Sequence, residues 1–511
     1  LSSATAQSIS FRQAVAKTAA TDPLLFKFYK ANDFRSLWVG DTNIEHERFN
    51  ALIQAFLGSA AHGLPPEKFG VDVLLAKAGA VKTDGQLGNL DVELTIDFLK
   101  YARAVEFGLL VPSSVDEEIV RKVDYQDRYK LLMSLKASNA KIFFRLLPPQ
   151  SFEYARLMKE KQRLERKITA GGWGPSVTLS KLEPGATGGS VVVLRNRLKE
   201  MGYLSHTFSA VYNTSLENAV SRFQVANGLF ATGVANTLTM EQINETAMER
   251  LMSVSVAMER ERWLNKDLGK RHILVNLTDF KAKIIDSGKV TFQTNTVIGA
   301  HDDNRRSPEF SDVMEHMIVN PSWYVPRSIV ITEYLPMLQE NPWAVDFLEL
   351  RDDGGNLVDR ADVDFKSFGE ESFPYSMRQP PSSDNALGLV KFMFPNQNNI
   401  YLHDTPAKKL FGLEVRTFSH GCIRLAEPFK FAHALLAAQT SEAVPVFQAA
   451  LDFKKKVQID LESQVPVHLI YRTAITLPGG GLEFRRDIYG RDAKIWNALQ
   501  LQGVVLNGVT G

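Results

Sequence analysis

One cysteine, Cys422, is the residue of this chain best suited to act as a nucleophile. It is the single cysteine among 511 residues, and it lies between His420 and Arg424 with Gly421 directly before it. A thiol reacts as its thiolate, and an unperturbed cysteine with a pKa of ~8.5 is mostly protonated at neutral pH. It therefore needs a base or a cation nearby. His403 precedes it by a stretch long enough for a loop to bring an imidazole beside the sulfur, so we predict a Cys422–His403 pair.

The residues around Cys422 indicate how an acyl intermediate would be held. The N–H groups of Gly421 and Cys422 are candidate donors to an oxyanion, and a glycine lets the backbone approach a substrate closely. His420 offers a second polar contact. Arg424 adds a fixed positive charge that favours a thiolate and can receive a substrate carboxylate. A simpler interpretation makes Cys422 a small buried apolar residue and His403 a solvated strand end. Their concentration in one segment favours catalysis.

Composition excludes several classes of protein. The chain has 59 basic and 58 acidic residues, for a formal charge of +1, which does not favour nucleic-acid or anionic-membrane partners bound by bulk electrostatics. We find no apolar run near the ~18 residues that span a bilayer. Metalloprotease, phosphate-loop and dinucleotide motifs are missing, which argues against metal or nucleotide chemistry. The chain begins at Leu1 with a short polar lead, as we expect of a processed, exported protein.

The chain is long enough for several hydrophobic cores, and the pattern of its residues changes along its length. Helical periodicity fills the N-terminal third, a Gly/Pro/Ser/Thr-rich stretch follows, and β-branched alternation then replaces it. We predict a multidomain α+β protein. The expected parts are a helical scaffold over 1–170, a small three-helix module over 180–245, a connecting helix over 246–270, a mostly-β catalytic domain over 271–490 and a C-terminal helix and tail over 491–511.

The helices of the small module are predicted to share one core. Its expected members are Val192, Leu194, Leu198, Ala219, Val220 and Phe223.

Three features of the β region lead to specific expectations. Alternating residues on both sides of "DSGK", 286–289, predict a hairpin. The strand series is interrupted by residues 327–386, and so long an excursion is interpreted as a lid over a site. Two strands joined at residues 478–481 would complete the same sheet.

Two segments resemble known families. Residues 180–245, with "GYL", "AVSRFQVANGL" and a Thr-Gly turn, resemble the peptidoglycan-binding domain type 1 family. His403 together with Ser419-His420-Gly421-Cys422-Ile423-Arg424 matches the signature of L,D-transpeptidase catalytic domains with the YkuD fold. "VNPSWYVPRSI" and "RQPPSSDNALGLVKFMFPN" look like the larger Gram-negative YcbB subtype, although Arg424 stands where many relatives have asparagine and Ser382-Ser383 where Gly-Pro is expected.

The resemblance implies a reaction and assigns roles to the candidate residues. Cys422 would attack the third residue of a peptidoglycan stem peptide, expel D-alanine and pass the acyl group to a second stem, which gives a 3-3 cross-link. His403 would be the base, held by a backbone carbonyl that we place at Asp404, and no metal or cofactor is needed. The expected site-shaping residues are Gly421, His420, Ser419 and Asp404, and the expected substrate-binding residues are Arg424, Tyr401 and Trp323.

The resemblance also implies partners and a place of action, and it leaves alternatives open. We expect peptidoglycan stem peptides and glycan strands as substrates, carbapenem-type inhibitors, no nucleic acid, and the periplasm or cell envelope of a Gram-negative bacterium. Water could replace the acceptor amine, giving an L,D-carboxypeptidase or amidase. A third interpretation is a catalytically idle peptidoglycan-binding scaffold.

Overall fold

The chain divides into two compact units, residues 1–266 with 472–511 and residues 267–471. The computed structural model describes residues 8–206, 208–264 and 267–506. The polar lead and the last part of the expected tail, residues 1–7 and 507–511, lie outside the described residues. The predicted nucleophile and base both belong to the second unit.

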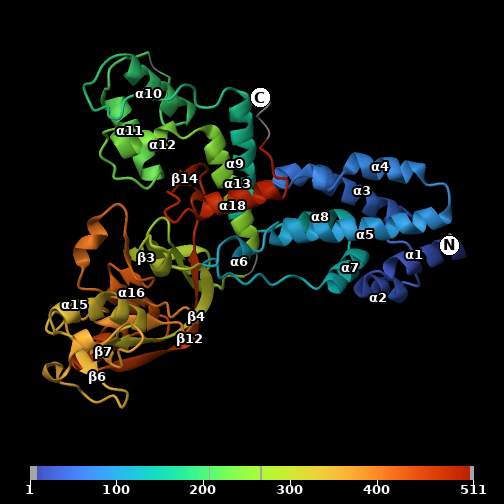
Figure 1. The fold of residues 1–511 in the computed structure, drawn as a ribbon. Helices are drawn as coiled ribbons and strands as arrows, with labels where there is room; N and C mark the ends of the chain where they lie inside the picture. The colour runs from blue at the N-terminus through green and yellow to red at the C-terminus, as the bar shows by residue number, and fades with distance from the viewer. Residues whose placement is uncertain (1–7, 207, 265–266, 507–511) are drawn as a thin grey trace. The chain divides into compact units, whose positions relative to one another are not determined.

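The first unit is mainly helical, in agreement with the periodicity of its sequence (Figure 1). Its helices are α1 (Ile9–Ala19), α2 (Pro23–Ala31), α3 (Asn43–Leu57), α4 (Val71–Ala80), α5 (Asp84–Phe107), α6 (Pro112–Val115), α7 (Arg128–Ala137), α8 (Ala140–Leu146), α9 (Phe152–Thr169), α10 (Gly189–Glu200), α11 (Thr214–Ala226), α12 (Thr237–Asn244), α13 (Ala247–Trp263) and α18 (Arg491–Leu501).

Side chains define where several of these helices begin. Helices α3, α5 and α13 each start with a capping box, in which a threonine accepts from the third backbone N–H and a Glu or Gln accepts from the threonine N–H. Two helix-end donors are satisfied in this way. In α13 the pair is Thr246 and Glu249, so the predicted connecting helix has a defined start inside 246–270.

The three-helix module has its own core, built from α10, α11 and α12. Most of the expected members are buried, but Val191 and not Val192 takes the inward position on α10. The fully buried residues that agree with the prediction are Leu194, Leu198, Ala219, Val220 and Phe223.

The C-terminal strands do not complete the catalytic sheet, so that expectation was wrong. β13 (Ala474–Thr476) and β14 (Leu482–Phe484) form a two-stranded sheet of their own. They belong to the first unit, where Ala474, Leu482 and Phe484 pack into a core with α9 and α13. Local alternation predicted the hairpin correctly, but the partner of a hairpin is decided by tertiary burial.

The second unit is built on a sheet. Its strands are β1 (Arg271–Asn276), β2 (Lys281–Asp286), β3 (Lys289–Gly299), β4 (Phe310–Val319), β5 (Trp323–Tyr324), β6 (Glu349–Arg351), β7 (Ser376–Gln379), β8 (Val390–Met393), β9 (Leu402–His403), β10 (Thr417–Ser419), β11 (Ile423–Leu425) and β12 (Val457–Ile470), and its helices are α14 (Arg327–Ile329), α15 (Leu335–Glu340), α16 (Pro428–Leu436) and α17 (Ala443–Asp452).

Nine of the described strands form one sheet in the order β10-β3-β11-β9-β8-β4-β12-β1-β2. The predicted hairpin is β2–β3, joined at residues 286–289, and β1 adds a third antiparallel strand. Because β3 also pairs with β2, the row of strands returns on itself. The three strands β8, β9 and β11 are adjacent within it, and they carry the candidate site.

The predicted lid is a folded subdomain. It contributes β6 and β7 to a three-stranded sheet with β5, and a π-helical turn, Val330–Tyr334, separates α14 from α15. These elements surround a separate apolar core that includes Leu338, Leu348, Phe365, Phe373 and Met377. Figure 1 shows β6, β7 and α15 together in the yellow to orange part of the chain. Because the insertion has its own packed core, its surface keeps a fixed shape.

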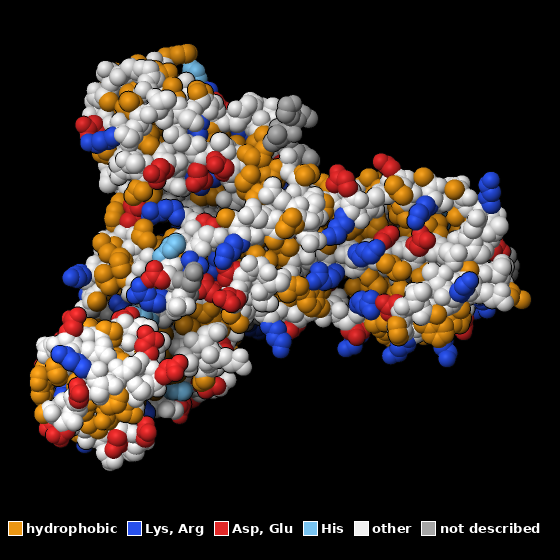
Figure 2. Space-filling model, viewed as in Figure 1, with side chains coloured by type: hydrophobic (Ala, Val, Ile, Leu, Met, Phe, Trp, Pro, Cys, Tyr) orange, Lys and Arg blue, Asp and Glu red, His pale blue; other side chains and the backbone are white. Residues whose placement is uncertain are grey.

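The visible surface in Figure 2 carries Lys and Arg side chains interspersed with Asp and Glu, as a formal charge of +1 leads one to expect. None of the described helices is both long enough and apolar enough to span a bilayer.

Candidate active site

Two short parallel strands bring the predicted nucleophile and base to one face of the sheet. β9 pairs with β11 so that His403 lies opposite Arg424, and the Ile423 N–H donates to the Tyr401 carbonyl at 3.1 Å. Side chains alternate between faces along a strand. Tyr401, His403, Cys422 and Arg424 therefore share a face, and all four line one cavity of about 1020 Å³.

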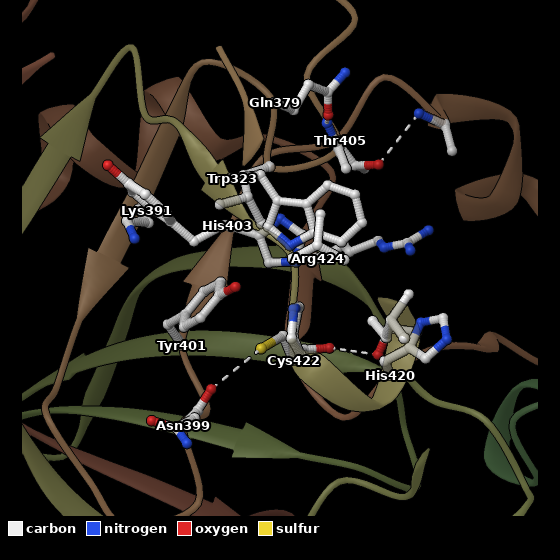
Figure 3. Close-up of a pocket in the computed structure, with 18 of the residues that line it drawn as sticks. Trp323, Gln379, Lys391, Asn399, Tyr401, His403, Thr405, His420, Cys422 and Arg424 are labelled. Atoms are coloured by element: carbon white, nitrogen blue, oxygen red, sulfur yellow. Dashed lines mark hydrogen bonds between the residues drawn. The ribbon is translucent and has the colours of Figure 1, made fainter. Parts of the chain in front are cut away.

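The Cys422 thiol is half-buried at the start of β11. Its sulfur lies 3.6 Å from the Asn399 carbonyl oxygen and, in Figure 3, points toward Asn399 and Tyr401. Burial raises the pKa of the thiol to about 11, although hydrogen bonding from Tyr401 and the charges of Lys391 and Arg424 favour the thiolate. At neutral pH the sulfur therefore carries its proton.

His403 is buried and oriented by the backbone. Its Nδ1 lies 2.5 Å from the Asp404 carbonyl oxygen, the acceptor that the family resemblance implied. A carbonyl can only accept, so Nδ1 carries the hydrogen and Nε2 keeps the lone pair in the neutral ring. Burial, followed by the charge of Arg424, lowers the pKa of His403 to about 3. The resting site thus combines a neutral thiol with a neutral imidazole.

Asp404 acts on the site through its backbone, and its side chain fixes the following loop. The carboxylate accepts from the Leu389 N–H at 2.9 Å, from the Thr405 N–H at 2.7 Å and from Lys408 Nζ at 2.5 Å. Asp404 is buried and does not line the cavity. These contacts hold the carbonyl that orients His403.

The loop before the predicted nucleophile is closed by its own hydrogen bonds. Ser419 Oγ donates to the Cys422 carbonyl at 2.6 Å and accepts from the Gly421 N–H at 3.2 Å. The Gly421 N–H, one of the two donors expected to serve an oxyanion, is therefore engaged within the loop. Gly421 has a φ of +105°, and a Cβ there would lie 3.2 Å from Ile400 Cδ1. Glycine is needed for this conformation, and it does not line the cavity.

His420 contacts the predicted lid. Its Nε2 lies 2.6 Å from Oε1 of Glu333, in the π-helical turn. Trp323 also lines the cavity, is buried, and packs edge-on against Tyr334 of the same turn with ring centroids 6.4 Å apart. The insertion expected to be a lid thus reaches the segment that carries the predicted nucleophile.

Sequence reasoning missed three residues of this site. Lys391 on β8 lies opposite His403 and lines the cavity. Ser307 donates to the Gly421 carbonyl at 2.6 Å, and Glu333 forms the lid contact. Lys391 lies within a stretch that carried the family resemblance, but nothing in the local spacing of these three residues indicated which neighbours they would meet.

Among the described residues, no group of three or more His, Cys, Asp or Glu side chains is arranged to hold a metal ion. The chemistry available is that of a thiol, an imidazole, two cations and aromatic walls in one cavity. Such a site can form and release an acyl–thiol intermediate.

Comparison with known families agrees with this geometry. Residues 270–447 match YkuD, the L,D-transpeptidase catalytic domain, residues 187–243 match a "Putative peptidoglycan binding domain" and residues 23–160 match a "Scaffold domain". The second unit therefore contains an L,D-transpeptidase catalytic domain of the YkuD family. Domains that act on peptidoglycan belong to the cell wall or envelope.

Individual proteins also show similarity to the chain. A Haemophilus influenzae protein named "Putative L,D-transpeptidase" is 28% identical over 298 residues, which cover 58% of this chain and 59% of that protein. The match thus spans less than two thirds of the relative. The crystal structure of an L,D-transpeptidase from Xylanimonas cellulosilytica has 13% sequence identity and a TM-score of 0.17, covering 58% of this chain and 98% of that chain.

Proposed function

We propose that the chain is an L,D-transpeptidase that forms 3-3 cross-links in peptidoglycan through a thioester on Cys422. The observation that carries this proposal is the shared face of β9 and β11, on which Tyr401, His403, Cys422 and Arg424 line one cavity next to the lid. We further propose that the chain belongs to the YcbB subtype, since a scaffold domain, a peptidoglycan-binding module and a folded lid accompany the catalytic domain.

In the donor half-reaction, the Cys422 sulfur attacks the carbonyl carbon of the diaminopimelate residue in a donor tetrapeptide stem. Because the thiol and the imidazole are both neutral at rest, the thiol proton passes to His403 Nε2 as the C–S bond forms. The C–N bond to D-alanine then breaks and the leaving amine takes that proton. The Asp404 carbonyl accepts from Nδ1–H throughout, which stabilises the transient imidazolium.

In the acceptor half-reaction, the side-chain amine of a second stem attacks the thioester. His403 accepts a proton from that amine, the C–S bond breaks, and the thiol is restored. With the Gly421 N–H engaged by Ser419, the Cys422 N–H is the remaining backbone donor proposed for the oxyanion. The lid limits the access of water, which would otherwise hydrolyse the thioester.

Other residues have supporting roles in this proposal. Arg424 binds a substrate carboxylate, while Tyr401 and Trp323 form walls of the groove.

The module within residues 180–245 holds the enzyme on glycan strands. Deletion of 180–245 is then expected to weaken binding to purified sacculi, and unchanged binding would remove this role. The place of action is the periplasm of a Gram-negative bacterium.

The decisive experiment uses one defined substrate. Purified protein is mixed with a disaccharide-tetrapeptide, and products are followed by mass spectrometry beside Cys422→Ala. A dimer lacking one D-alanine, formed only with the thiol present, supports transpeptidation. Disaccharide-tripeptide alone would make water the acceptor, and the lack of any thiol-dependent product would favour an idle scaffold.

A second test probes the thiol directly. Carbapenems are proposed to acylate Cys422, which is half-buried in an accessible cavity. The intact mass of the wild-type chain is expected to rise by one inhibitor, and that of Cys422→Ala is expected to stay constant. An unchanged wild-type mass would contradict an accessible, reactive thiol.

A further inference from the structure

Lys391 is a cation of the site that the proposed reaction does not use. It lies on β8, directly opposite His403 on β9, and it lines the cavity. Its Nζ lies 5.2 Å from the centroid of the Tyr401 ring. Lys391 therefore extends its ammonium group from its position opposite His403 toward the Tyr401 ring, at the strand end that lies beside Cys422.

The positive charge of Lys391 has no protein anion to balance it. Among the described residues, no carboxylate forms an ion pair with Lys391 or with Arg424, and exposed Asp384 is the one acidic side chain of the cavity lining. Burial, and then the charge of Lys456, lower the pKa of Lys391. Cations in such places are normally paired, so an anion from outside the chain is the expected partner.

Lys391 and Arg424 lie on opposite sides of the predicted base. The pairing of β8, β9 and β11 gives the row Lys391, His403, Arg424, and Figure 3 shows the same order. His403 exchanges a proton with the leaving amine in the proposed mechanism. The α-carboxylate of an amino acid is one carbon away from its amine nitrogen, so a carboxylate bound for reaction must come close to this row.

We propose that Lys391 is a specificity-determining residue that binds a carboxylate of the donor stem peptide. The cavity then selects stems with free carboxylates beside the scissile amide over amidated stems. The carboxylate has two possible sources, the leaving D-alanine or the far end of diaminopimelate. This proposal rests on the proposed function for the identity of the substrate.

Binding is measured in the Cys422→Ala background, where turnover does not interfere. Three ligands are titrated by calorimetry: the free-acid tetrapeptide, the same peptide amidated at D-alanine, and the same peptide amidated on diaminopimelate. Lys391→Met is expected to weaken binding of the free acid by about 10- to 100-fold, since a hydrogen-bonded charge pair is lost. One of the two amidated peptides should bind the Lys391→Met variant and its parent with affinities within about threefold of each other. The carboxyl group that is amidated in that peptide is the one that Lys391 contacts.

The ratio of the affinity for the free-acid peptide to the affinity for each amidated peptide is measured within each variant. A general loss of folded protein therefore does not mimic the effect. Lys391→Arg keeps the charge and should recover most of the discrimination. Lys409→Met, an exposed lysine outside the cavity, is the matched control and should bind all three ligands as the parent does. Equal losses for the three ligands, or no loss for any, would overturn the proposal.

Turnover supplies an independent readout. In the otherwise wild-type chain, Lys391→Met should raise KM for the free-acid stem by about 10- to 100-fold and change kcat by less than about threefold. If the wild type forms no thiol-dependent product from any stem, the proposed function fails, whereas the binding comparison still decides the role of Lys391.

Discussion

His420 Nε2 and Glu333 Oε1 lie 2.6 Å apart and join the loop before Cys422 to the π-helical turn of the predicted lid. Both side chains are about one third exposed, at 34% and 38%. The contact is therefore partly screened by solvent and is worth at most about 1 kcal/mol. A weak contact of this kind can break and form again readily.

The lid contact predicts a local change in Glu333→Gln. Loss of the carboxylate should speed amide hydrogen exchange of residues 327–340 by up to about fivefold, the equivalent of about 1 kcal/mol, with the sheet strands unchanged. Glu340→Gln, an exposed neighbour on α15, is the control. Equal exchange in the two variants would show that Glu333 does not hold the turn.

The raised pKa of Cys422 predicts how its reactivity depends on pH. The pKa lies at about 11 in the folded chain, well above that of a free cysteine, so the thiolate fraction at pH 7 is lower by on the order of 100-fold. Since the thiolate is the form that reacts, iodoacetamide alkylation should rise with pH to a midpoint near 11. The only cysteine makes intact mass a direct measure. A midpoint below 8 would mean a preformed thiolate.

A neutral His403 predicts two different outcomes for His403→Gln. A ring with a pKa of about 3 carries no charge at pH 7, so its removal should change the alkylation rate of Cys422 by less than about threefold. Formation of cross-linked product should fall by about 100-fold or more, because proton transfer during the reaction is lost. If alkylation became slower and product formation did not change, His403 would maintain the thiolate and would not transfer the proton during the reaction. The measurements are stopped-flow alkylation and product mass spectrometry at one pH.

The local part of the site could be predicted from sequence, because the partners are close along the chain. The Asp404 carbonyl adjoins His403, and Ser419 through Arg424 form one continuous segment. Alternation also predicted the β2–β3 hairpin, whose turn is local. The domain boundaries and the role of each site residue remain predictions.

The contacts that sequence did not reveal are those between distant segments. Lys391 meets His403 through the register of β8 and β9, and Glu333 meets His420 through the fold of the lid. The β13–β14 hairpin joins the first unit through apolar burial against α9 and α13. Register and burial partners depend on tertiary packing, which spacing along the chain does not determine.

The backbone conformation of Gly421 predicts that Gly421→Ala disables the site while the chain still folds. A φ of +105° is unfavourable for alanine, and its Cβ would meet Ile400 Cδ1 at 3.2 Å and the Arg306 carbonyl at 3.4 Å. We expect a loss of about 1–3 kcal/mol in the free energy of unfolding, and a shift of the adjacent nucleophile.

The measurements for Gly421→Ala are urea unfolding and the rate of thiol-dependent product formation. Gly412→Ala is the control, because its Cβ would meet nothing within 4 Å and its φ is not positive. Product formation should fall by at least about 10-fold in Gly421→Ala, since even a small misplacement of a reacting group is costly, and stay near wild type in Gly412→Ala. Wild-type rates in both variants would show that the strained turn before Cys422 does not set the position of its sulfur.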